Sequence, residues 1–225
     1  MTIKIHTIPL TAVNCYLLNG EKTILIDAGF PGLMKLFLRK LANFEIKPEE
    51  IDLVIITHAH ADHIGIAKEI KEFTGAKIAI HQRDKVWLES GKMPIPRGVT
   101  LLGKVASSLL NLIPEITVPP TGADIILGDE NYPLNDFGIP GKIVYTPGHT
   151  MGSVSVLLDS GEAFVGDLAM SARFMRFKPG YSIFAEDMVQ IEQSVNKLLE
   201  MGMEIIYPAH GKPFPAEVFR RRRGR

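Results

Sequence analysis

The sequence contains a single cysteine, no excess of charge of either sign and no long hydrophobic run. Because one thiol, Cys15, cannot form an intramolecular disulfide, the chain has no disulfide framework, which fits a reducing cytoplasm. Its 25 Lys and Arg residues balance its 25 Asp and Glu residues, so the overall charge gives no attraction toward nucleic acid or an anionic membrane. Residues 1–6 alternate like a strand and lack the apolar core of a signal peptide. No apolar run is long enough to span a membrane. We therefore expect a cytoplasmic protein with neither a membrane nor a nucleic acid as partner.

The chain of 225 residues, 46% of them apolar, is long enough for one large α/β domain that covers residues 1–225. Strand-like runs at 3–8, 12–18 and 23–26 are separated by expected turns at Pro9 and at Asn19-Gly20. Helical periodicity at 33–41 and 64–73 then alternates with apolar runs at 51–56 and 77–80. After residue 140 strands are expected at 142–146, 154–158, 163–165 and 204–207, and a helix at 188–198. This order is compatible with two sheets packed face to face.

The segment from about 83 to 120 interrupts this pattern and is predicted to be an insertion. Its residues 99–113 are apolar with almost no charge and lie between proline-containing stretches. Two interpretations stay open: a buried helix that packs on the body of the domain, or an apolar surface that forms a lid over the active site or a homodimer contact.

Four potential metal ligands occur within residues 58–63, which read His-Ala-His-Ala-Asp-His. They follow the apolar run 53–56 and precede a predicted helix, so they lie in a loop at the end of a strand, where scaffolds present functional groups. Buried imidazoles and a carboxylate at this density need a cation to satisfy them. The cluster therefore predicts a site for a divalent metal.

Further ligand-type residues follow other short apolar strands: His149, Asp167 and His210. Repeated placement at strand ends lets distant segments assemble one polynuclear site along one edge of a sheet.

With these motifs in this order, the chain resembles the metallo-β-lactamase-fold hydrolases, over about residues 14–210. The resemblance implies a four-layer αββα sandwich of two mixed sheets flanked by helices. It also implies two divalent ions, zinc in the first instance, with iron or manganese as alternatives. The implied ligands of the first ion are His58, His60 and His149, those of the second are Asp62, His63 and His210, and Asp167 bridges the two. Asp27 resembles the aspartate that supports the histidine loop from behind.

The implied reaction is hydrolysis of a small-molecule thioester, lactone or ester by a metal-bridging hydroxide. Asp62 either handles the proton of that hydroxide or serves only as a ligand. Asp167 counts against true β-lactamases, and Met170 stands where related lactonases carry tyrosine. Glyoxalase II enzymes share every ligand but add a carboxy-terminal helical domain, so we expect a compact member of the glyoxalase II and lactonase-like branch.

The loop at 171–178 follows Asp167 and interleaves cations with aromatic rings, so Arg173, Phe174 and Arg176 are candidate substrate contacts. The alternative is a loop with solvated cations and core rings. Other functions on the same scaffold are a phosphodiesterase and a mononuclear iron persulfide dioxygenase, in which His58, His149 and Asp167 would hold the iron. A non-catalytic metal-binding module is the third interpretation.

Overall fold

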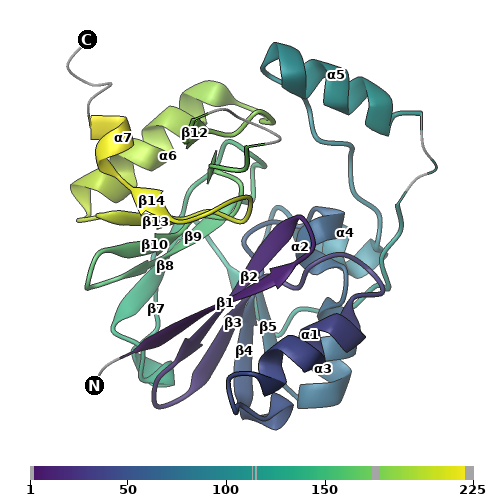
Figure 1. Cartoon of the computed structure of the whole chain (residues 1–225), viewed down its shortest axis with the longest axis vertical. Coiled ribbons are helices and arrows are strands. Elements are labelled where there is room, and N and C mark those ends of the chain that lie inside the picture. The colour runs from purple at the N-terminus through teal and green to yellow at the C-terminus, as the bar shows by residue number, and fades with distance from the viewer. Residues whose placement is uncertain (1–2, 113, 115, 174–177, 221–225) are drawn as a thin grey trace.

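Two six-stranded sheets form the centre of the molecule in the computed structural model, which describes residues 3–112, 114, 116–173 and 178–220 (Figure 1). The first sheet has the order β1 (Lys4–Leu10), β2 (Val13–Asn19), β3 (Thr23–Ile26), β4 (Ile51–Ile55), β5 (Lys77–His81) and β6 (Ile125–Leu127). The second has the order β14 (Phe214–Pro215), β13 (Ile205–Tyr207), β10 (Glu162–Phe164), β9 (Val154–Leu158), β8 (Gly141–Tyr145) and β7 (Tyr132–Pro133). A short separate ribbon pairs β11 (Ala169–Met170) with β12 (Gly180–Tyr181).

Helices cover the outer faces of both sheets. The α-helices are α1 (Met34–Ala42), α2 (Ala61–Ile64), α3 (Ala67–Thr74), α4 (Lys85–Ser90), α5 (Leu101–Leu110), α6 (Met188–Glu200) and α7 (Glu217–Arg220), with 3-10 turns at Pro48–Glu50 and Asn135–Phe137. Figure 1 shows α1 and α3 beside the first sheet and α6 and α7 beside the second. Both sheets are mixed, because β3 to β6 are parallel and β10 pairs with β13 in parallel, while the other ladders of each sheet are antiparallel. The α/β fold of two mixed sheets with flanking helices is confirmed.

The two sheets and the helices on their outer faces form four layers, and apolar side chains fill the three interfaces between these layers. The central strands are therefore apolar on both faces. In β3, Ile24 and Ile26 point into the core between the sheets, whereas Leu25 points toward the helices of the first sheet. In β9, Val156 lies between the sheets and Leu157 packs on the side of α6. Alternate residues of one strand therefore serve two different cores.

The predicted turn at Pro9 is wrong, because β1 continues through Pro9 to Leu10 and the hairpin turns at Thr11, whose φ is 63°. Proline has no N–H to donate to a ladder, but β1 is the edge strand of its sheet, where proline is tolerated.

The apolar segment is not a buried helix, and that interpretation is wrong. Of the residues of α5 only Gly103 is buried, whereas Leu101 is 82% exposed and Leu109 is 59% exposed. Figure 1 shows α5 at the end of two long connections, apart from both sheets. Within the described residues, no helix combines the length and the apolar character needed to cross a membrane.

Candidate metal centre

Five segments bring their polar residues to the same edge of the two sheets because of strand direction. β3 and β4 are parallel, and Asp27 and the run 58–63 follow their carboxyl ends. In the second sheet β8, β10 and β13 all run the same way, because β9 is antiparallel to both of its neighbours and β13 is parallel to β10. His149, Asp167 and His210 follow these three strands. The face-to-face packing of the sheets then places both sets of residues together.

Three histidine rings form one group of potential ligands. Nε2 of His149 lies 3.1 Å from Nε2 of His58 and 3.0 Å from Nδ1 of His60. All three side chains are buried. Burial, together with the neighbouring histidines, lowers the pKa of His58 well below its usual value, that of His60 to about 3 and that of His149 to about 4. At neutral pH these rings are uncharged, which is the state that binds metal.

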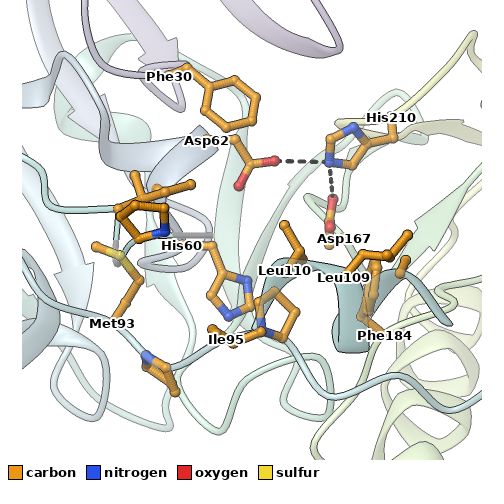
Figure 2. Close-up of a pocket in the computed structure, with 16 residues that line it drawn as sticks. Phe30, His60, Asp62, Met93, Ile95, Leu109, Leu110, Asp167, Phe184 and His210 are labelled. Atoms are coloured by element: carbon orange, nitrogen blue, oxygen red, sulfur yellow. Dashed lines mark ion pairs between the residues drawn. The ribbon is translucent and has the colours of Figure 1, made fainter. Parts of the chain in front are cut away.

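Two carboxylates and two further histidines form the adjacent group. Nε2 of His210 lies 3.2 Å from Oδ2 of Asp62 and 3.3 Å from Oδ1 of Asp167 (Figure 2). Nε2 of His63 lies 3.6 Å from Asp62 and 3.7 Å from the same oxygen of Asp167. The other oxygen of Asp167 is 3.7 Å from Nε2 of His149. Asp167 thus presents one oxygen to each group.

Charge within this second group shifts its pKa values in the opposite direction. Burial alone would lower the pKa of His63, but Asp62 and Asp27 outweigh it and raise that pKa to about 9. Burial is likewise outweighed at His210, where Asp167 and Asp62 raise the pKa to about 10. Burial would raise the pKa of Asp62, but His63 and His210 hold it well below its usual range. Without metal, this group is a network of buried ion pairs.

Hydrogen bonds behind the rings fix which nitrogen can face a metal. Nδ1 of His149 donates to the carbonyl of Phe184 at 3.0 Å, and Nδ1 of His210 donates to the carbonyl of Ala12 at 2.8 Å. Nδ1 of His63 donates to Asp27 at 2.9 Å. In each neutral ring the lone pair is therefore on Nε2, which points into the site.

Two buried atoms lack a hydrogen-bond partner among the described residues at this point, Nε2 of His63 and Oδ1 of Asp167. Native proteins rarely leave such atoms unsatisfied. A divalent cation accepts imidazole nitrogen and carboxylate oxygen together, and three sets of ligand atoms lie within 4.8 Å of one another. These sets are His58, His60 and His149; His58, His63 and Asp167; and Asp62, His63 and His210. The residues present fit a metal centre.

Asp27 supports the histidine loop through hydrogen bonds to Thr57 and His63. Its Oδ1 accepts from the backbone N–H of Thr57 at 2.8 Å, and its carboxylate also accepts from the Thr57 hydroxyl. Gly166 permits this arrangement, because a Cβ there would lie 2.5 Å from the same hydroxyl. Asp27 itself adopts φ 63°, a conformation that aspartate tolerates better than most side chains.

Asp84 is a supporting residue that sequence reasoning missed. Its Oδ2 accepts from the backbone N–H of Ala59 at 3.0 Å and from the hydroxyl of Thr150 at 2.9 Å. Ala59 lies between two histidines of the first group, and Thr150 follows the third, so one carboxylate joins both loops. Burial raises the pKa of Asp84 to about 6, although its hydrogen bonds oppose the shift. The available signal was its position just after β5, which ends at the same edge as β4.

A cavity of about 630 Å³ opens beside the two groups (Figure 2). His60, Asp62, Asp167 and His210 line it, and the other side chains of its wall are apolar. Figure 2 shows Leu109 and Leu110 of α5 together with Met93, Ile95 and Phe184 around this wall. The segment that was predicted to be an insertion therefore lines the space next to the ligand-type residues.

The predicted substrate loop is only partly described. Arg173 is exposed and lies at a second hollow, beside Ala12, Asn14 and Lys212, which shares no lining residue with the cavity at the metal centre. Phe174 and Arg176 lie outside the described residues. A role of this loop in substrate binding stays a prediction.

Known proteins share both the sequence pattern and this architecture. The sequence model of the metallo-β-lactamase superfamily matches residues 8–210. The probable metallo-hydrolase MJ0888 of Methanocaldococcus jannaschii is 29% identical over 203 residues, which cover 88% of this chain and 87% of that protein. The probable metallo-hydrolase YflN of Bacillus subtilis is 25% identical over 236 residues, covering 96% and 87%. The crystal structure of BLEG-1 B3 metallo-β-lactamase superimposes with a TM-score of 0.68 at 23% identity, covering 95% of each chain.

The family match spans nearly the whole chain, and the ligand-type residues of the metal centre lie within or at the end of the matched range. The chain therefore belongs to the metallo-β-lactamase superfamily. The likeness to solved β-lactamases is below 25% identity and shows the fold alone.

Proposed function

We propose that the protein is a hydrolase with two divalent metal ions and that it cleaves a thioester, lactone or ester. The observation that carries this proposal is the convergence of seven ligand-type side chains, four of which line a largely apolar cavity. Two relatives that cover most of this chain are named metallo-hydrolases, which supports the same class of reaction.

The two groups of side chains divide into two sites. His58, His60 and His149 would hold one ion, and Asp62, His63 and His210 the other, with an oxygen of Asp167 toward each. When bound, two such ions supply a polarised substrate carbonyl and a water that is acidic enough to react near neutral pH. Zinc suits this mixture of imidazole and carboxylate ligands, and iron or manganese are the alternatives.

The chain's own residues orient the reaction and handle its proton. Asp62 lies at the cavity and is 20% exposed, so its carboxylate can contact a substrate or a water molecule. We propose that this carboxylate holds the proton released by the reacting water, as a general base. The apolar wall of the cavity keeps bulk water from the carbonyl group, which strengthens electrostatic interactions at the site.

The decisive experiment measures turnover of a panel of substrates by protein loaded with zinc. The panel contains thioesters, lactones, simple esters, phosphodiesters and β-lactams. We expect cleavage of a thioester, lactone or ester, and we expect His60→Ala to abolish it, because this change removes one of three ligands from the first site. Circular dichroism checks that the variant keeps its fold. Unchanged turnover by His60→Ala would refute the assignment of the site.

The panel also separates the alternative activities. Cleavage of phosphodiesters alone would identify a phosphodiesterase. A single iron per chain, with sulfite formed from glutathione persulfide, would identify the dioxygenase, and His58, His149 and Asp167 would then be the ligands. The seven-residue ligand set favours the two-metal hydrolase, because the dioxygenase leaves four of these residues without a role as ligand, namely His60, Asp62, His63 and His210.

Three finer properties are part of the same proposal. These are membership of the glyoxalase II and lactonase-like branch, a cytoplasmic location, and a homodimer formed through the exposed face of α5. Sedimentation of the wild-type protein and of the Leu101→Asp variant measures the oligomeric state. Leu101 is an 82% exposed position of that face.

A further inference from the structure

The volume and the apolar lining of the cavity indicate what kind of substrate the cavity accepts. Its volume of about 630 Å³ is within the range of about 300–1,000 Å³ that is usual for small-molecule sites. Away from the ligand-type residues the wall consists of apolar side chains, among them Phe30, Met93, Ile95, Leu109 and Phe184. Such a wall gains free energy by removing apolar substrate surface from water.

The described part of the cavity wall offers no partner to an anionic group away from the ligand-type residues. Among the described residues no lysine or arginine lines it, and the only ionisable side chains there are His60, Asp62, Asp167 and His210. All four belong to the metal centre. A phosphate or carboxylate placed against the apolar wall would lose its hydration without gaining a partner. The part of the substrate that lies there is therefore uncharged.

Helix α5 forms one side of this wall. Contacts of the helix itself and of the segment just before it hold the helix in place. The N–H of Val99 donates to the carbonyl of Ile183 at 2.9 Å, and the N–H of Ala185 donates to the carbonyl of Arg97 at 2.9 Å. A Cβ at Gly103 would lie 2.2 Å from the Ile183 carbonyl, so glycine allows the helix to approach this closely. Ala106, one turn further on, packs against the cluster formed by Met170, Ile183 and Phe184. Backbone hydrogen bonds and close packing therefore fix the position of this side of the wall.

We infer that the cavity binds an aliphatic acyl chain, so that the substrates are medium-chain acyl thioesters or esters. This inference rests on the proposed hydrolase function and specifies its substrate class. The scissile carbonyl group lies at the ligand-type residues, and the chain extends toward α5. A polar or anionic leaving group points away from the cavity, because no cation in the described wall would receive it there.

Acyl-chain selectivity tests the inference on the zinc-loaded enzyme. Each buried methylene strengthens binding by up to about fourfold. We therefore expect kcat/KM for p-nitrophenyl octanoate to exceed that for the acetate by at least about tenfold. Equal or lower kcat/KM for the octanoate would overturn the inference.

Two variants of α5 residues that line the cavity test where the acyl chain of the substrate lies. Ala106→Phe fills space beside Phe184, and Leu110→Ser makes the wall polar, so each should lower the octanoate-to-acetate ratio by at least about fivefold. Leu101→Ala is the matched control, because Leu101 is on α5 but is 82% exposed and does not line the cavity. It should keep the wild-type ratio. If both wall variants are folded by circular dichroism and keep the wild-type ratio, the inference is wrong.

A binding measurement on metal-free protein separates this inference from the proposed function. By calorimetry, 1-octanol should bind at least about tenfold more tightly than 1-butanol, and Ala106→Phe should remove most of the difference. If the protein prefers octanol in this way but, with two metals bound, cleaves no ester or thioester, the proposed function is wrong and the inferred binding of aliphatic chains in the cavity is supported. If octanol binds no better than butanol, the inference fails whatever the enzyme hydrolyses.

Discussion

At the scale of single residues, the metal centre depends on where each imidazole carries its proton. The carbonyls of Phe184 and Ala12 and the carboxylate of Asp27 each occupy the Nδ1 side of a histidine ring. The second nitrogen then faces the centre without any need for the ring to rotate. The histidines of the two groups differ strongly in pKa, because burial and neighbouring histidines lower the pKa in the first group, whereas carboxylates outweigh burial and raise it in the second.

Metal binding at pH 7.5 should release at least two protons per chain. In the metal-free protein His63 and His210 have pKa values of about 9 and 10, so both rings are charged at this pH. A metal needs the neutral rings and displaces both protons, so its affinity falls as pH is lowered, by up to about tenfold per proton for each pH unit. Calorimetry of zinc binding in two buffers with different ionisation enthalpies measures the number released.

His210→Gln is the control for proton release, since it removes one of the two basic rings and should lower the number by about one. His60 has a pKa of about 3 and is already neutral, so it contributes no proton at this pH. Zinc binding without proton release would show that the second group is not part of the metal centre.

Asp62→Asn separates a proton-handling role from pure ligation. The amide keeps an oxygen near His210 but cannot take up a proton, so kcat should fall by about 10²–10⁴-fold while two metals stay bound. Metal analysis and steady-state kinetics on the same preparation measure both quantities. Loss of one metal in proportion to the loss of activity would mean that Asp62 acts only as a ligand.

At the scale of elements, the site is built from the loops that follow parallel strands of two different sheets. The loops must keep a fixed separation, because the first ligand group takes two histidines from the loop after β4 and one from the loop after β8. Asp84, which follows β5, bonds to both loops and is buried with them. It is a positioning residue for the first group.

Asp84→Ala should weaken zinc binding at the first group by about 10–100-fold, the usual effect of losing a residue that orients metal ligands. Trp87, the single tryptophan of the chain, stacks on His60 with ring centroids 6.4 Å apart, so its fluorescence can follow the titration. Asp129→Asn is the matched control, because Asp129 is 47% exposed and bonds to Arg83 and His81 away from the ligands. Equal zinc affinities for the two variants would show that Asp84 does not position the first ligand group.

At the scale of the whole molecule, sequence reasoning predicted many of the central strands and pointed to the ligand-type residues after them, because both depend on local patterns, whereas it did not predict the short strands β6, β7 and β14. Short apolar runs predicted strands such as β4 and β9 within a residue of their observed bounds, and the residues after them were predicted to meet at one edge. The burial of α5 could not be predicted, because an apolar sequence is the same whether it faces a core or lines a cavity. Asp84 was missed for a related reason: its partners, Ala59 and Thr150, are far from it in sequence.

We propose that one chain holds two metal ions, one in each ligand group, and counting the metals bound to the intact protein is the sharpest test of this proposal. We predict two divalent ions per chain by native mass spectrometry and elemental analysis. We further predict one ion in His210→Ala, which leaves His58, His60 and His149 in place. A single iron per wild-type chain, or a protein that binds no metal at micromolar concentrations, would contradict the account.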